Sequence, residues 1–157
     1  MKENNELNNK FSFFIVDDDE RKIEMNRMIM QTFGIKPVCI NNNFYDELVK
    51  CISNTYDEGK YPVIFLDEDF GSYMYKGDEI VKLLINNFNE KGGVLMPFSS
   101  SYKEQLENWK QLKTDNWVTP ENGKIPIEYI MSGDLDECCN EYLHLEKEIS
   151  SENRNIS

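Results

Sequence analysis

The sequence predicts a doubly wound α/β domain, with a five-stranded parallel sheet between two layers of helices. Two observations predict this class. Short, nearly continuous apolar runs alternate along the chain with segments in which apolar residues recur at helical spacing, and there is no internal repeat. Such runs are typical of strands covered by helices on both faces. At 157 residues the chain is long enough for one compact domain and too short for two enzyme domains.

Four apolar runs are the predicted strands: FSFFIV at 11–16, PVCI at 37–40, PVIFL at 62–66 and GVLMPF at 93–98. The position of the fifth strand is open within residues 114–133. Both NWV and IPIEYIM are candidates there, and Pro120, Gly123 and Pro126 interrupt the segment. We therefore also expect a loop or a short extra element in this stretch.

The segments between the strands have the apolar spacing of helices that face a core. Their apolar positions are Met25, Met28, Ile29 and Phe33; Phe44, Leu48 and Ile52; Val81, Leu84 and Phe88; and Tyr102, Leu106 and Trp109. A last helix is predicted to start at Asp134, with Glu137 three residues later as in a capping box. Its apolar positions are Leu135, Cys138, Tyr142, Leu145 and Ile149.

The two ends of the chain are predicted to be disordered tails. Residues 1–10 contain four asparagines, and residues 150–157 (SSENRNIS) are similarly polar, so burial at either end does not offset the entropy of ordering. The predicted domain therefore spans residues 11–149.

The charge balance excludes some classes of function. The formal net charge is −12 at pH 7, and the basic residues form no stripe that would neutralise a phosphate backbone, so direct nucleic-acid binding is disfavoured. No apolar stretch approaches the roughly 20 residues that cross a bilayer, and the N-terminus lacks the basic start and apolar centre of a signal peptide. We therefore expect a cytoplasmic protein without a membrane partner.

No C-x-x-C pair is present and His144 is the single histidine, so the usual Cys/His zinc site cannot be assembled. A histidine late in a charged helix also argues against a catalytic triad, which needs a nucleophile and a carboxylate in the same cleft. We interpret the cysteines as free, mostly buried thiols in a reducing compartment, and His144 as a solvated residue of a charged helix. The cysteines are Cys39, Cys51, Cys138 and Cys139.

Acidic residues directly follow two of the predicted strands. They are Asp17, Asp18, Asp19 and Glu20 after FFIV, and Asp67, Glu68 and Asp69 after VIFL. Neighbouring parallel strands place these ends side by side, where converging carboxylates repel one another unless a hard cation such as Mg²⁺ neutralises them. We assign Asp18 and Asp67 to such a site. Asp19 and Glu20 are assigned to the N-terminal cap of the following helix.

Four motifs, in order, resemble the receiver domains of bacterial two-component response regulators (CheY-like) over residues 11–149. FFIVDDDE is similar to the first strand and acidic pair of that family, with Asp17 and Asp18 at the matching positions, and VIFLDEDF is similar to its third strand. MYKGDEIVKLL is similar to the start of its third helix at Gly77, and VLMPFSSS to its fourth strand, with Ser99 as the hydroxyl residue. One short insertion after the third strand accounts for the longer spacing to both later motifs. The resemblance implies a flavodoxin-like, three-layer α/β/α fold.

The resemblance also implies a chemistry. Asp67 would accept a phosphoryl group on its carboxylate, while Asp18, Asp67 and the backbone carbonyl of Asp69 hold Mg²⁺. Asp17 would hold a water bound to the ion. Ser99 is expected to donate a hydrogen bond to the phosphoryl oxygen, which changes a surface that a partner protein recognises.

The resemblance implies a stand-alone signalling domain rather than an enzyme, since no output domain follows the last helix in this sequence. The implied partners are a sensor histidine kinase or phosphotransfer protein and a downstream protein target that the sequence does not identify. Homodimerisation is left open.

The end of the fifth strand departs from the family pattern. The family has a lysine followed by a proline there, whereas the matching stretch here (WVTP) has Thr119. Lys124 in the following loop is the alternative source of this cation, although a neighbouring glycine and two prolines favour a solvated loop residue. The aromatic switch position of the family matches Trp117 or, after a shift of one residue, Asn116.

Two other functions compete with this assignment. The missing Lys-Pro pair favours a receiver-like interaction module that has lost phosphotransfer. A haloacid-dehalogenase-type phosphatase also uses an aspartate nucleophile in a D-x-D motif at a strand end, followed by a Ser or Thr, a Lys and a late acidic pair. Residues 17–19 or 67–69 match the D-x-D loosely, Ser99 matches the hydroxyl residue, and GDLDE at 133–137 matches the acidic pair. However, neither D-x-D is followed by the Thr or Val of that fold, and two acidic strand ends are more than it requires.

Overall fold

The computed structural model describes residues 5–41, 45–67, 77–97, 107, 109, 116–120 and 125–155. Five parallel strands form one sheet in the order β2-β1-β3-β4-β5. The strands are β1 (Phe11–Val16), β2 (Pro37–Ile40), β3 (Tyr61–Leu66), β4 (Gly93–Pro97) and β5 (Trp117–Val118). The four strands predicted from apolar runs are confirmed to within one residue at each end.

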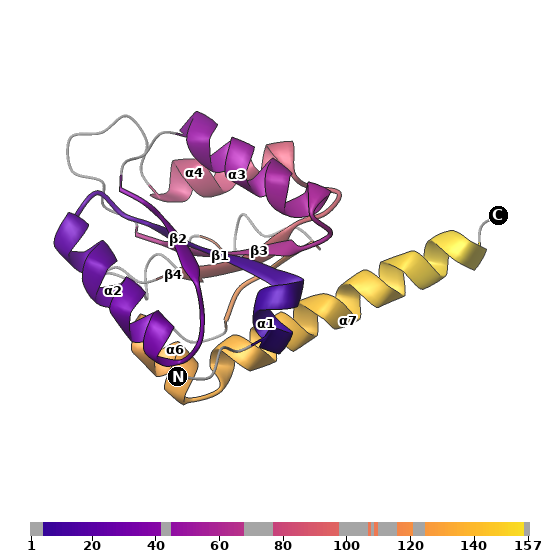
Figure 1. The fold of residues 1–157 in the computed structure, drawn as a ribbon. Helices are drawn as coiled ribbons and strands as arrows, with labels where there is room; N and C mark the ends of the chain where they lie inside the picture. Colours follow the sequence, from indigo (N-terminus) through magenta and orange to yellow (C-terminus); the bar gives the residue numbers. More distant parts are fainter. Residues whose placement is uncertain are drawn as a thin grey trace.

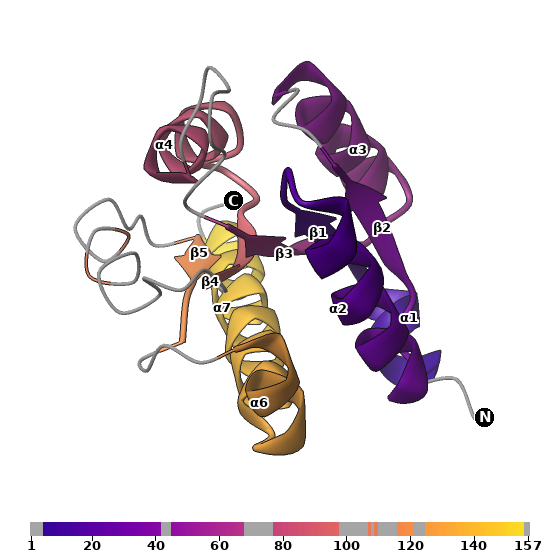
Figure 2. The same ribbon diagram turned by 90° about the vertical axis from the view of Figure 1, so that its left-hand side faces the viewer.

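Helices cover both faces of the sheet, which confirms the predicted three-layer class (Figure 1). One face carries α3 (Tyr45–Asp57) and α4 (Gly77–Asn87), and the other carries α2 (Glu20–Thr32), α6 (Pro126–Met131) and α7 (Asp134–Asn155). A short helix, α1 (Asn5–Lys10), precedes β1. Figure 2 shows the sheet between these two layers from a direction 90° away.

The strand order reverses at β1, since the chain goes from β1 outward to β2 and then returns to the other side of β1 with β3. The ladder pairs Val16 of β1 with Leu66 of β3, so these two strands end level with each other. Ligands of open α/β sheets bind at the carboxyl ends of the strands at such a reversal. The fold therefore points to the residues directly after Val16 and Leu66.

Each face of the sheet has its own hydrophobic core, because successive side chains of a buried strand point to opposite faces. Phe11, Phe13 and Ile15 of β1 pack with residues of α2, α6 and α7. Phe14 and Val16 pack with residues of α3 and α4. All five side chains are at most 2% exposed, so β1 is held on both sides up to its last residue.

Helix α2 turns a different face to the sheet than predicted. Met25, Met28 and Phe33 are 55%, 59% and 40% exposed, so the expectation that they belong to the core is wrong. The buried positions are instead Ile23, Asn26 and Met30. These positions also recur at helical spacing, but the polar Asn26 in their middle obscures the stripe in the sequence.

The apolar stripes predicted for α3, α4 and α7 are confirmed at the positions whose burial the structure describes, with Phe88 and Leu145 only partly buried. Buried positions include Leu48, Ile52, Val81, Leu84, Trp109, Leu135, Cys138 and Tyr142. Phe44, Tyr102 and Leu106 lie outside the described residues, as does the side chain of Ile149, so the helix expected around residues 102–109 stays a prediction. The four cysteines are free thiols, two of them buried, and the His144 side chain is 74% exposed beside Glu148, both as expected.

The segment 114–133 contains both a strand and an extra helix. Trp117–Val118 forms β5, which pairs with the start of β4, whereas the alternative strand candidate IPIEYIM forms α6. Pro126 is tolerated in the first turn of a helix, where an N–H has no intrahelical partner. The fully buried Tyr129 anchors α6 to the core on the α2 and α7 side of the sheet.

Both ends of the chain differ from the predicted tails. Residues 5–10 form α1, because Leu7 packs against the core and the side chain of Asn8 bonds the carbonyl oxygen of Gly34 at 2.7 Å and the N–H of Lys36 at 3.3 Å. Helix α7 continues to Asn155 and extends past the sheet (Figure 1). None of the described helices is long and apolar enough to span a membrane.

Candidate functional site

Three carboxylates meet where β1 and β3 end. Asp17 and Asp18 follow Val16, and Asp67 follows Leu66 in the neighbouring strand. One carboxylate oxygen from each of the three lies within 4.8 Å of the other two. Asp17 is fully buried and Asp67 is 3% exposed, whereas Asp18 is half-buried. The predicted convergence of Asp18 and Asp67 with Asp17 is therefore what the structure shows.

The backbone of the sheet holds these residues in place. The N–H of Asp17 donates to the carbonyl oxygen of Ile40 at 3.1 Å, and the N–H of Asp67 donates to that of Val16 at 3.2 Å. Both bonds continue the parallel ladders one residue past the strands. The acidic residues are thus fixed by the rigid part of the fold rather than by a loop.

The electrostatics of the cluster are unfavourable for a bare set of charges. The pKa of Asp17 is raised to about 7, mainly because the carboxyl group is buried. The charge of Asp67 and contacts with Asp18 and Asp67 also raise the pKa, whereas the hydrogen bond from the N–H of Asp19 lowers it. That N–H donates to Oδ1 of Asp17 at 3.1 Å. The other oxygen, Oδ2, is buried without a hydrogen-bond partner within the described part of the chain.

These features fit a hard divalent cation. The three residues offer only carboxylate oxygens, which Mg²⁺ prefers over nitrogen or sulfur ligands, and the buried unpaired oxygen of Asp17 would gain a partner from the ion or from its water. Asp18 and Asp67 are the residues that would hold Mg²⁺ directly. The predicted contribution of the Asp69 backbone carbonyl lies outside the described residues.

Asp19 caps helix α2, as the sequence predicts. Its Oδ1 accepts hydrogen bonds from the N–H groups of Arg21 at 2.9 Å and Lys22 at 3.4 Å. Glu20 is the first residue of α2, where a negative charge is favourable. The side chain of Asp19 is therefore used by the helix, while those of Asp17 and Asp18 are left for the cluster.

Lys22 is a site residue that the sequence reasoning missed. Its Nζ lies 4.0 Å from Oδ2 of Asp67. One signal was present in the sequence: Lys22 is a basic residue in the first turn of a helix, where the helix dipole disfavours a cation. A nearby group of carboxylates removes that conflict.

Thr119 directly follows β5, whose last residue, Val118, pairs with Val94, so Thr119 lies level with the middle of β4 and not with the acidic residues that follow β1 and β3. Its Oγ1 is buried and has no hydrogen-bond partner among the residues that the structure describes. Trp117 is 2% exposed and belongs to the core on the α3 and α4 side, so it has the core role rather than a surface one. Asn116 lies at the opposite, amino end of β5, where its amide donates to the carbonyl oxygen of Asn89.

Two other predicted site residues, Ser99 and Lys124, lie outside the described residues. The strand before Ser99 ends at Pro97, which pairs with Leu66, so β4 ends at the same edge as Asp67. Gly77 begins α4, in agreement with the predicted helix start.

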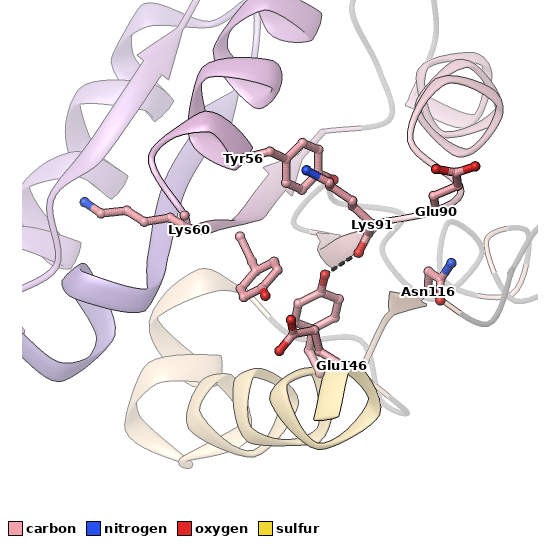
Figure 3. A pocket seen from close by; sticks show the side chains of 9 residues that line it. Tyr56, Lys60, Glu90, Lys91, Asn116 and Glu146 are labelled. Atoms are coloured by element: carbon pink, nitrogen blue, oxygen red, sulfur yellow. Dashed lines mark hydrogen bonds between the residues drawn. The ribbon is translucent and has the colours of Figure 1, made fainter. Parts of the chain in front are cut away.

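A separate pocket of about 300 Å³, seen in Figure 3, lies at the amino ends of the strands, opposite the edge that carries the acidic cluster. Lys60, Lys91 and Asn116 from the segments before β3, β4 and β5 line it, together with Tyr56 of α3 and Glu146 of α7. Lys91 Nζ lies 5.2 Å from the centre of the Tyr56 ring, a cation–π contact. The pocket shares no residue with the acidic cluster.

No protein-family model matches the sequence, and no curated protein matches it. Solved structures do match. A sensor protein from Polaromonas sp. JS666 has a TM-score of 0.62 at 13% identity, covering 85% of this chain and 98% of that chain. The response regulator TrrA from Thermotoga maritima, in complex with Mg²⁺ and BeF, has a TM-score of 0.52 at 19% identity. The match covers 82% of this chain and 98% of that chain. A CheY-like receiver domain protein from Methanospirillum hungatei JF-1 has a TM-score of 0.52 at 15% identity, and the match covers 88% of this chain and 98% of that chain.

The chain therefore has the fold of a CheY-like receiver domain, as the sequence resemblance implied. At these identities the likeness concerns the fold. The function has to be argued from the site.

Proposed function

We propose that this chain is a receiver domain in which Asp67 accepts a phosphoryl group, with Mg²⁺ bound beside it, and that this switches a protein-interaction surface. The observation that supports the proposal is the meeting of Asp17, Asp18 and Asp67 at the point where the strand order reverses. A lone acid at a strand end would be explained by a helix cap. A helix cap does not explain three converging acids, two of which are buried.

In the proposed reaction a carboxylate oxygen of Asp67 attacks the phosphorus of a phosphohistidine or of a small acyl phosphate. A P–O bond to Asp67 forms while the bond from phosphorus to the donor's nitrogen or oxygen breaks, and its electron pair stays with the donor. Bound Mg²⁺ would neutralise the charge on the oxygens of the group in transfer. The protein fixes the nucleophile, since Asp67 is bonded through its N–H to β1.

On this proposal the chain is a phosphoacceptor and not a multiple-turnover enzyme. The donor would be a sensor histidine kinase or phosphotransfer protein, and the target a further protein. Ser99 and the backbone carbonyl of Asp69 keep the roles that the sequence resemblance implies for them. A cytoplasmic location is part of the proposal, because its four cysteines would stay reduced there.

Thr119 favours a second candidate, an interaction module that has the receiver fold without phosphotransfer. It stands where the resemblance implies a lysine that pairs with the phosphoryl group. The phosphatase alternative is not favoured, because the side chain of Asp19, the second acid of its first D-x-D motif, is used to cap α2.

Beryllofluoride, which mimics a phosphoryl group on a carboxylate, tests the proposal in the presence of Mg²⁺. We expect saturable binding by the parent chain and no binding by Asp67→Asn. The binding is monitored through the NMR chemical shifts of the residues around the cluster. Absence of binding by the parent chain would favour the interaction module. Sustained hydrolysis of a generic phosphate ester would instead support a phosphatase.

A further inference from the structure

Lys22 brings a positive charge to the acidic cluster from helix α2. Its Nζ lies 4.0 Å from Oδ2 of Asp67. The Lys22 side chain is 47% exposed and that of Asp67 is 4% exposed. The ammonium group therefore lies on the solvent side of a buried carboxylate, which is the side from which a phosphoryl donor has to approach.

The start of α2 sets the position of Lys22. The Asp19 side chain accepts hydrogen bonds from the N–H groups of Arg21 and Lys22, so the first turn of the helix is fixed directly after β1. The N-terminus of a helix disfavours a cation, so attraction by the nearby carboxylates has to hold the ammonium there. Lys22 is thus held near Asp67 by both its backbone and its charge.

A phosphorylated site would need more positive charge than Mg²⁺ supplies. Three carboxylates are present before a phosphoryl group adds its own negative charge. At the end of β5 the structure provides the neutral hydroxyl of Thr119. A hydrogen bond from an ammonium to a phosphoryl oxygen is about twice as strong as one between neutral groups.

We propose that Lys22 is the cation that binds the phosphoryl group on Asp67, and this inference rests on the proposed function. Lys22 would take the role that the family resemblance implies for a lysine at position 119, where this chain has the uncharged Thr119. Without the phosphoryl group the ammonium lies against Asp67 and competes with Mg²⁺ for that carboxylate. Once the phosphoryl group is attached, the ammonium donates to one of its oxygens, and the flexible four-carbon stem of lysine allows this movement.

The test is a pair of titrations on the full chain and three variants: Lys22→Met, Lys22→Arg and, as the matched control, Arg21→Met. Arg21→Met removes one positive charge from the neighbouring exposed position of the same helix. The first titration adds Mg²⁺ alone, and the second adds beryllofluoride at saturating Mg²⁺, with the ¹⁹F NMR signal of the bound fluoride as readout.

Lys22→Met should weaken beryllofluoride binding about tenfold, the loss of one charge-assisted hydrogen bond, and should at the same time tighten Mg²⁺ binding. Lys22→Arg should retain most of the beryllofluoride affinity, and Arg21→Met should resemble the parent. These opposite changes distinguish the proposed role from general damage to the fold, which would weaken both ligands. Adding Thr119→Lys to Lys22→Met should restore beryllofluoride binding.

Equal beryllofluoride affinities for Lys22→Met and Arg21→Met would overturn the role of Lys22 while the function of Asp67 stands. If the parent chain binds no beryllofluoride at saturating Mg²⁺, the proposed function fails and the role of Lys22 fails with it.

Discussion

The N–H of Asp67 donates a hydrogen bond to the carbonyl oxygen of Val16 at 3.2 Å, so the residue after β3 is bonded to the strand that leads into Asp17. The ladder between β1 and β3 thus continues one residue past both strands, and the two carboxylates cannot move apart without breaking it. Their mutual repulsion is therefore a fixed property of the sheet. It makes the response of the protein to Mg²⁺ and to pH predictable.

Mg²⁺ should stabilise the folded protein, because it binds the assembled cluster and not the unfolded chain. At a free concentration of 100 times the dissociation constant, the expected gain is about 2.7 kcal/mol. Asp18→Asn and Asp67→Asn should lose most of this gain, whereas Asp46→Asn, at an exposed position of α3, should keep it. Thermal unfolding with and without MgCl₂ measures the effect, and equal shifts in all four proteins would argue against the site.

Without Mg²⁺, stability should fall as the pH rises from about 4 to about 7. The pKa of Asp17 is raised from 3.8 to about 7 in the folded state, so in this window the folded protein holds a proton that the unfolded chain has released. One such proton gives a slope of about 1.4 kcal/mol per pH unit. Urea unfolding in EDTA should show this slope for the parent and not for Asp17→Asn. A parent whose stability rises over this window would contradict the assignment.

The observed orientation of α2 can be tested with two methionines of the same helix. Met30 is fully buried, so Met30→Ala should cost about 2–5 kcal/mol of unfolding free energy. Met28 is 59% exposed, so Met28→Ala should change stability by less than about 0.5 kcal/mol. Urea unfolding curves decide, and the reverse ranking would restore the face predicted from the sequence.

The loop lysine and the threonine at the end of β5 should behave differently. Lys124→Ala should leave beryllofluoride affinity unchanged, because the glycine and prolines around Lys124 favour a solvated loop residue. Thr119→Lys should strengthen beryllofluoride binding, since it adds a cation at the position where the family resemblance implies a lysine. Isothermal titrations of the two variants check both expectations. A loss with Lys124→Ala would instead make Lys124 the phosphoryl-binding lysine.

The strands and the acidic cluster could be predicted because they follow from local patterns. Apolar runs such as FSFFIV mark buried strands, and the parallel arrangement then brings Asp17, Asp18 and Asp67 together. Strand β5 was ambiguous because it is only two residues long.

Other features depend on tertiary contacts that periodicity does not encode. Helix α1 is polar and depends on Leu7 and on the hydrogen bonds of Asn8 to a distant loop. The core face of α2 includes the polar Asn26, which the more apolar methionine stripe outweighed in the sequence. Lys22 of α2 lies close to Asp67, which follows β3 and is 45 positions later in the sequence. No spacing rule predicts such a contact.

The identity of the phosphoacceptor is the central claim, and intact-mass measurement tests it most directly. The parent chain is incubated with a small acyl phosphate and Mg²⁺, alongside Asp67→Asn and the control Asp46→Asn. The account predicts one labile phosphoryl addition in the parent and in Asp46→Asn, and none in Asp67→Asn or after removal of Mg²⁺ with EDTA. A phosphoryl addition that survives Asp67→Asn, or no addition to the parent chain, would contradict it.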